Sequence, residues 1–223
     1  MTDILVAIST VADGSMYNRH DKADASVIHN REVFLKKHHI SLEQTTRVRT
    51  LYEGDNYCRY KEATEAEKGD GMKDDQVAIS DGLVTTNLNH ALFLPVADCV
   101  GAVLYDPKKQ VLMVSHLGRH SLEQGGGIKS VAYLKEKYGC DPKDLKVWLT
   151  PAPGKDAYPI WKLDNKGMKE VTFEQLSIAG ILPENITDNP ADSTKDVNYY
   201  SYSEFLKGNR KKDGDHVVVA MMR

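Results

Sequence analysis

The chain has 223 residues, of which 41% are hydrophobic and 27% charged, so it can bury the core of a globular protein. Its formal net charge of −3 gives no indication of a nucleic-acid partner or an anionic membrane surface. No apolar run approaches the roughly 20 residues of a membrane span, and the N-terminus lacks the basic residues of a signal peptide. Three irregularly spaced cysteines do not suggest a disulfide framework, so we expect a cytoplasmic protein.

The first third of the chain contains predicted strands, one helix and a charged segment. Residues 3–9 read as a strand, and apolar side chains recur at near-helical spacing over residues 25–38, which predicts a helix. Residues 45–54 have strand character and end at Gly54. Residues 61–76 are almost wholly charged or glycine, so we expect a solvated surface loop, with a mobile lid over a site as the alternative.

From Asp81 onward the chain contains short apolar runs bounded by Gly, Pro, Asn or Asp, which predict buried strands. These runs are DGLVTT, HALFLPVA, VGAVLYD and QVLMVSH. A helix is predicted over 121–138 with Gly139 as its C-cap, then a strand within LKVWLTPAPG, a short helix over 170–180 and a terminal strand, HVVVAMM. The pattern predicts the α+β class, with one domain over residues 1–223 and a mixed β-sheet core flanked by helices.

Cys99 and His116 each end an apolar run, and the segment between them predicts a hairpin with DPKKQ as its turn. We expect both residues at the C-terminal ends of successive strands, where a rigid sheet can position functional groups. Cysteine and neutral histidine are zinc ligands, and a thiolate beside an imidazole is an activated nucleophile. Simple packing is the alternative for a free cysteine. Asp98 directly precedes Cys99 and is a candidate substrate contact.

Several segments together resemble one known family in their order and spacing. They are STVADGSMYN, HNR at 29–31, SDGLVTTNLNHALFLPVADC, VSHLGRH, VWLTPAPGKDAY and STKDVNYYSY. The 17-residue step from Cys99 to His116 is also similar to the family's own spacing. Over most of its length the chain resembles the laccase-domain proteins, also called the multicopper polyphenol oxidase or YfiH-like family.

The resemblance implies a zinc protein with a His–Cys–His site in a shallow pocket. It implies an enzyme that acts on purine nucleosides, by phosphorolysis of adenosine, inosine or methylthioadenosine or by deamination of adenosine. A nucleoside and phosphate would then be the small-molecule partners, and a monomer is expected. The family's fold is also similar to that of a bacterial toxin deamidase with a Cys–His pair, which implies a second mechanism.

The chain departs from the family at the first metal ligand, because residues 41–89 contain no histidine. Glu53 takes the histidine's place if Gly54 is the motif glycine, and Tyr52 takes it if the register slips by one residue. Cys58 is a further candidate. A glutamate oxygen can bind zinc, so the expected metal ligands are Cys99, His116 and Glu53. If Tyr52 occupies the place instead, the third ligand is lost.

A second departure lies in HLGRH, where Arg119 and His120 stand at the family's Trp and Arg positions. A guanidinium matches a phosphate, so Arg119 and Arg31 are candidate anion contacts. His120 is a candidate contact, ligand or base, with a solvated loop histidine as the alternative. A third departure is the loss of cysteines at Asp156 and in Ser193–Thr194, which makes copper unfavourable because copper prefers soft ligands.

These residues leave three hypotheses open. The first is a zinc-dependent purine nucleoside enzyme, in which Tyr52 or Tyr158 stacks on the base. The second is a metal-free hydrolase or deamidase, with Cys99 as nucleophile and His116 as general base. The third is a non-catalytic relative that binds a nucleoside or a partner without turnover. Both catalytic hypotheses predict that Cys99 Sγ and the His116 imidazole lie within about 4 Å of each other.

Overall fold

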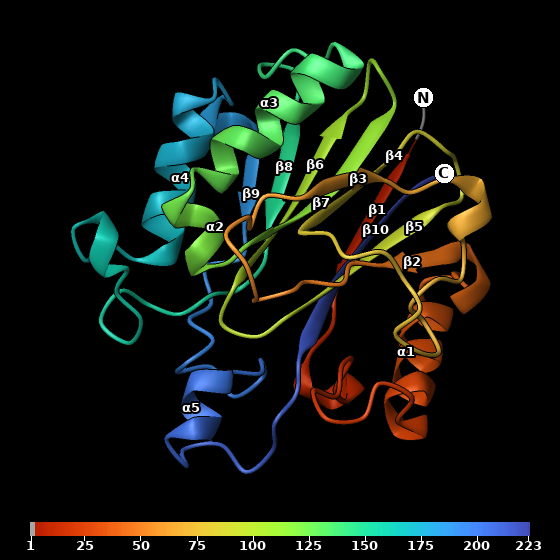
Figure 1. Cartoon of the computed structure of the whole chain (residues 1–223), viewed down its shortest axis with the longest axis vertical. Coiled ribbons are helices and arrows are strands. Elements are labelled where there is room, and N and C mark those ends of the chain that lie inside the picture. Colours follow the sequence, from red (N-terminus) through yellow and green to blue (C-terminus); the bar gives the residue numbers. More distant parts are fainter. Residues whose placement is uncertain (1–2) are drawn as a thin grey trace.

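Two mixed β-sheets form the centre of the molecule (Figure 1). The computed structural model describes residues 3–223. The smaller sheet has the order β1 (Ile4–Ile8), β10 (His216–Met222), β5 (Ala91–Val96), β2 (Thr45–Arg47). The larger sheet has the order β3 (Tyr60–Glu62), β4 (Gly82–Thr85), β7 (Val111–Leu117), β6 (Val100–Asp106), β8 (Lys146–Leu149), β9 (Ile186–Asp188). The α+β class is confirmed, and the expected mixed-sheet core is divided between two sheets.

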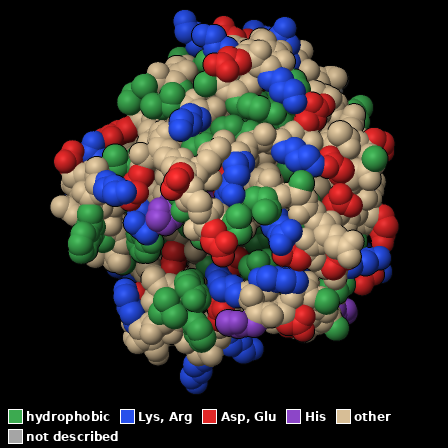
Figure 2. Space-filling view, in the orientation of Figure 1, with side chains coloured by type: hydrophobic (Ala, Val, Ile, Leu, Met, Phe, Trp, Pro, Cys, Tyr) green, Lys and Arg blue, Asp and Glu red, His purple; other side chains and the backbone are tan. Residues whose placement is uncertain are grey.

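The sheets pack face to face, with helices on both outer faces (Figure 1). Because side chains alternate along a strand, Leu92 and Leu94 of β5 face the larger sheet, whereas Phe93 faces α1 (Ala25–Lys37). On the far side, α3 (Gly126–Tyr138) and α4 (Met168–Ile178) cover the larger sheet. The layers are therefore helix, sheet, sheet and helix. Figure 2 shows Lys, Arg, Asp and Glu side chains interspersed over one face, with no gathered field of either sign.

Most predicted elements are confirmed within one or two residues at their ends. Gly139 ends α3 with φ +68°, a left-handed conformation that suits glycine. The helix expected over 121–138 is two helices, because Gly125 at φ +76° separates α2 (Arg119–Glu123) from α3. Three short elements were not predicted, β3, β9 and α5 (Tyr202–Leu206). None of the helices within residues 3–223 combines the length and apolar character needed to cross a membrane.

Two sequence predictions in the first half are wrong. The strand expected over 45–54 stops at Arg47, and the chain then turns outward through an exposed stretch. For the segment 61–76 the prediction is wrong in part, because the segment is mostly an irregular surface stretch but is not solvated throughout. It starts in β3, and its Ala63 and Met72 are buried in the core. The prediction from composition failed because a few small and apolar residues anchor this mostly charged segment in the core.

Candidate functional site

The hairpin of β6 and β7 brings Cys99 and His116 to one edge of the larger sheet. His116 lies near the end of β7 and pairs with Gly101 of β6, while Cys99 lies just before β6 begins. The prediction of two C-terminal strand ends is therefore wrong for Cys99. In an antiparallel pair the start of one strand lies beside the end of the other. A Cβ placed on Gly118 would lie 3.0 Å from Cys99 Sγ and 2.7 Å from His116 Cε1, so both side chains border one point.

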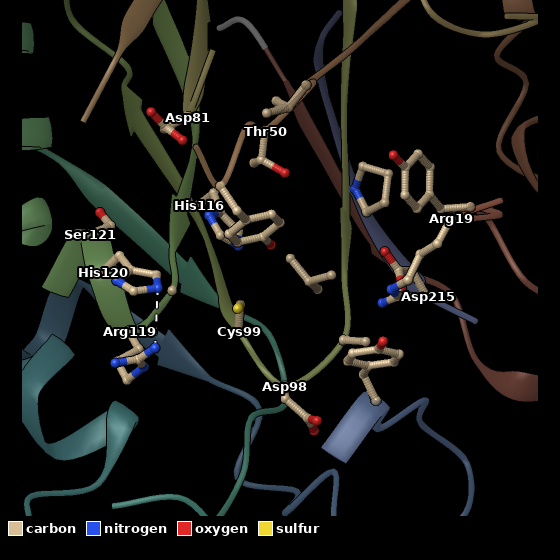
Figure 3. A pocket seen from close by; sticks show the side chains of 18 of the residues that line it. Arg19, Thr50, Asp81, Asp98, Cys99, His116, Arg119, His120, Ser121 and Asp215 are labelled. Atoms are coloured by element: carbon tan, nitrogen blue, oxygen red, sulfur yellow. Dashed lines mark hydrogen bonds and ion pairs between the residues drawn. The ribbon is translucent and has the colours of Figure 1, made fainter. Parts of the chain in front are cut away.

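Around this point lies a cavity of about 620 Å³ (Figure 3). Its walls come from the chain after β1, the chain after β2, the β5–β6 connection, the β7–α2 junction and the residue before β10. The cavity brings together most of the predicted site residues, namely Tyr52, Asp98, Cys99, His116, Arg119, His120 and Tyr158. Glu53, Cys58 and Arg31 are not among its lining residues.

Burial determines the protonation states of Cys99 and His116, the pair at the centre of the cavity. It raises the pKa of the Cys99 thiol to about 12, with the charges of Asp98 and Asp215 adding to the effect. Burial also lowers the pKa of His116 to about 4, so at neutral pH the pair is a thiol and a neutral imidazole. Since the thiolate is the nucleophilic form of cysteine, these surroundings disfavour Cys99 as the nucleophile of a metal-free hydrolase.

Tyr52, and not Glu53, takes the inner position beside the pair. Glu53 is exposed, whereas the Tyr52 ring lies edge-on to His116 with 6.2 Å between the ring centroids. The Tyr52 ring is open to the cavity, and 60% of the residue is exposed. Burial of its hydroxyl and the proximity of Cys99 nevertheless raise the pKa of Tyr52 above its ordinary value. The Tyr57 hydroxyl donates a 3.1 Å hydrogen bond to the Tyr52 carbonyl, which holds this turn.

The donor atoms present therefore do not fit a three-ligand zinc centre. Within residues 3–223 no three His, Cys, Asp or Glu side chains are placed to share a metal ion. The expected ligand Glu53 is replaced by a phenol that keeps its proton. Sulfur and imidazole ligands are available from Cys99 and His116, but the third carboxylate or imidazole is missing.

Protein purified without added metal is expected to contain far less than one zinc per chain, because the site offers two ligands. A Tyr52→His variant should raise the zinc content toward one per chain, since it returns an imidazole to the position beside His116. Elemental analysis of both proteins, and of Tyr52→His combined with Cys99→Ser, measures this. Near-stoichiometric zinc in the wild type that is lost in Cys99→Ser alone would contradict the expectation.

On one side of the cavity Arg119 and His120 lie at the start of α2 (Figure 3). Arg119 Nη2 is 3.1 Å from His120 Nε2, and the His120 ring stacks on Tyr57 with centroids 4.6 Å apart. Burial and the neighbouring guanidinium lower the pKa of His120, so the ring accepts a hydrogen bond from Arg119. The Arg119 side chain is 40% exposed, and among residues 3–223 the only carboxylate it contacts is that of Glu123, at a long distance of 3.5 Å. It is free to bind an anion.

Asp98 serves to join chain segments. It has φ +65°, and its carboxylate accepts hydrogen bonds from the Ser193 hydroxyl at 3.2 Å and the Ser203 backbone N–H at 2.6 Å. Figure 3 shows this carboxylate pointing away from Cys99 and His116. Although Asp98 lines the cavity, its oxygens are used to hold the C-terminal segment beside the site.

Arg31 lies outside the cavity, and its prediction as an anion contact is corrected. Its guanidinium donates to the backbone carbonyls of Met16, Gly71 and Met72 in the core beneath α1. Asn30 donates in the same way to the carbonyl of Ser15. The Asn–Arg pair and the glycine–serine segment that carried the resemblance are therefore bonded to each other.

Sequence reasoning missed the opposite side of the cavity, where Arg19 meets Asp215 (Figure 3). Arg19 Nη2 lies 2.5 Å from Asp215 Oδ1, and Arg19 Nη1 lies 2.8 Å from Asp213 Oδ1. The Arg19 guanidinium also lies 4.3 Å from the centroid of the Tyr202 ring. These residues come from the two ends of the chain, so no local spacing could have connected them.

Comparison with known proteins gives a family and a fold. The family described as multi-copper polyphenol oxidoreductase laccase matches residues 12–168. The chain is 29% identical over 143 residues to purine nucleoside phosphorylase YlmD of Bacillus subtilis (strain 168), covering 63% of this chain and 50% of that protein. It is 28% identical over 132 residues to purine nucleoside phosphorylase LACC1 of Mus musculus, covering 50% of this chain and 31% of that protein. The matched region thus spans half or less of these relatives.

Solved structures show the same fold at lower identity. YfiH of Bacillus licheniformis superposes with a TM-score of 0.84 at 20% identity, covering 99% of this chain and 93% of that one. YlmD of Geobacillus stearothermophilus superposes with a TM-score of 0.83 at 19% identity, covering 99% and 92%. The α+β arrangement of two mixed sheets is therefore shared with these proteins.

Proposed function

The chain belongs to the multi-copper polyphenol oxidoreductase laccase family, and we propose that it cleaves a purine nucleoside with phosphate. The observation that carries the proposal is the layout of the cavity. Figure 3 shows Arg119 and His120 on one side, Arg19 and Asp215 on the other, and Cys99 and His116 between them. The names of the two curated relatives support the same substrate class.

The cavity has the size and lining that a nucleoside needs. Its volume of about 620 Å³ lies within the range of small-molecule sites. Five of its lining residues are tyrosines, whose rings can stack on a purine: Tyr17, Tyr52, Tyr57, Tyr158 and Tyr202. The neutral His116 ring and the Tyr52 hydroxyl offer hydrogen bonds to ribose hydroxyl groups. An aromatic lining with a few convergent polar groups favours this ligand over a peptide.

In phosphorolysis the two sides of the cavity bind different parts of the reacting pair. Arg119, with His120 beside it, holds the phosphate through the paired N–H groups of its guanidinium. A phosphate oxygen forms a bond to C1′ of the ribose, the C1′–N9 bond breaks, and its electron pair leaves with the base. The products are ribose 1-phosphate and the free purine. Because the site holds phosphate and nucleoside in the orientation needed for attack, this positioning supplies most of the rate acceleration.

Because the zinc donor set is incomplete, the proposed phosphorolysis contains no metal-dependent step. Deamination of adenosine requires an activated water, and no described residue is placed to activate one through three-ligand zinc. Cysteine-dependent hydrolysis requires a thiolate, and burial raises the pKa of Cys99 to about 12. Phosphorolysis requires neither, because phosphate is itself the nucleophile. It is therefore the activity to test first.

Inosine and adenosine incubated with the protein are expected to release free purine only when phosphate is present, as measured by chromatography. In Arg119→Ala the KM for phosphate should rise about tenfold or more, because a charge-assisted bond contributes about 1.5–3 kcal/mol. The KM for the nucleoside should change little. Lys162→Ala is the matched control, since Lys162 contacts the same Glu123 at 3.3 Å but lies outside the cavity. Purine release without phosphate, or none at all, would contradict the proposal.

A further inference from the structure

The ion pair of Arg19 and Asp215 lies in a wall of the cavity. Asp215 directly precedes β10 and is 6% exposed. Its Oδ1 accepts from Arg19, and its backbone N–H donates to the Ser15 hydroxyl at 3.1 Å. Among the described residues, Oδ2 of Asp215 has no hydrogen-bond partner. One carboxylate oxygen is therefore held in place and the other is available to a ligand in the cavity.

The surroundings of this oxygen suit a purine base. The Tyr202 ring lies under the Arg19 guanidinium, and Tyr17, two residues before Arg19 in the chain, also lines the cavity. Arg119 and His120 lie on the opposite side (Figure 3). A nucleoside whose C1′ faces phosphate at Arg119 must extend its base away from that residue. The base then reaches the side that carries Asp215.

We propose that Asp215 is a catalytic acid that protonates the purine as it leaves the ribose, an inference that rests on the proposed phosphorolysis. As the C1′–N9 bond breaks, its electron pair enters the base and the Asp215 carboxyl gives its proton to N7. Asp215 is left as a carboxylate beside Arg19, whose charge stabilises it. The proton lost by Asp215 is regained from water after the neutral purine departs.

The charges around Asp215 suit this task. Burial, reinforced by Asp213, raises its pKa to about 6 against the opposing effect of Arg19. A general acid works best when its pKa is near the working pH. The titratable or charged groups whose fields reach it are Arg19, Lys22, Arg31, Tyr52, Cys99, Tyr200 and Asp213. Between pH 5 and 8 the Arg19 and Arg31 guanidinium groups stay charged, and Tyr52, Tyr200 and Cys99 keep their protons, because the pKa of each lies well above this range.

The test compares inosine with 7-methylinosine, whose N7 already carries a methyl group and a positive charge and needs no proton. In Asp215→Asn the kcat for inosine should fall about 100-fold, within the usual range for loss of a general acid. The kcat for 7-methylinosine should stay within about threefold. Asp144→Asn is the control, since Asp144 also pairs with a cation, Lys108 at 2.7 Å, but both residues lie outside the cavity, and it should leave both rates within about threefold.

A second measurement needs no variant. In the wild type the ratio of the inosine rate to the 7-methylinosine rate should fall about tenfold per pH unit above roughly pH 6, as Asp215 loses its proton. A ratio that does not change with pH, or equal losses on both nucleosides in Asp215→Asn, would overturn the role of Asp215. Wild type that cleaves neither nucleoside with phosphate would instead overturn the proposed function.

Discussion

Gly118→Ala is expected to lower kcat/KM for nucleoside phosphorolysis by about 100-fold while the protein stays folded. The new Cβ would lie 2.7 Å from His116 Cε1 and 3.0 Å from Cys99 Sγ, so one of these side chains must move. Displacing a group that positions the substrate by about 1 Å can cost on the order of 100-fold in rate. Gly118 has φ −82° and ψ 172°, which alanine adopts without strain, so the effect comes from space alone.

A matched glycine makes this prediction specific. Gly167 is also the residue before a helix, with φ −75° and ψ 156°, and a Cβ there would lie 3.1 Å from Lys155 Cβ on the surface. Gly167→Ala should leave activity unchanged. Both variants should lose no more than about 1–3 kcal/mol in the free energy of unfolding, the usual cost of a crowded methyl group. Full activity in Gly118→Ala would mean that Cys99 and His116 are not near the reacting atoms.

Arg31→Met is expected to lower the free energy of unfolding by about 3–5 kcal/mol. Methionine keeps much of the apolar stem but leaves the carbonyls of Met16 and Met72 without a donor in the core. The Gly71 carbonyl loses its bond from Arg31 and keeps the one from Arg47. Each buried polar group that loses its partner costs about 1–3 kcal/mol, partly offset by the easier burial of an uncharged side chain. Urea unfolding followed by circular dichroism measures the change.

The control is Arg49→Met, where the arginine is about one-third exposed and bonds Asp75 at 2.9 Å. It should cost less than about 1 kcal/mol, as is typical of a surface ion pair. Any Arg31→Met protein that remains folded should keep its KM for phosphate. If Arg31→Met unfolds like the wild type but no longer binds phosphate, the side chain is an anion contact after all.

The strand and helix pattern could be predicted from the sequence because each element repeats at its own period. Short apolar runs bounded by turn residues predicted β4 to β7, and helical spacing predicted α1 and α3. The Cys99–His116 pair was predictable for the same reason, since one short turn joins the two strands and antiparallel pairing decides the edge. The part of the site within one hairpin is thus determined by local sequence.

Only the tertiary structure determines which residues far apart in the sequence come together. The division into two sheets depends on which apolar faces pack together, which strand alternation does not specify. Whether Tyr52 or Glu53 points inward depends on one residue of register in a turn. Arg19 and Asp215 meet because β1 and β10 pair, bringing the two ends of the chain to one cavity wall. Local periodicity specifies elements, whereas long-range packing decides which loops converge, and most of this cavity is made by loops.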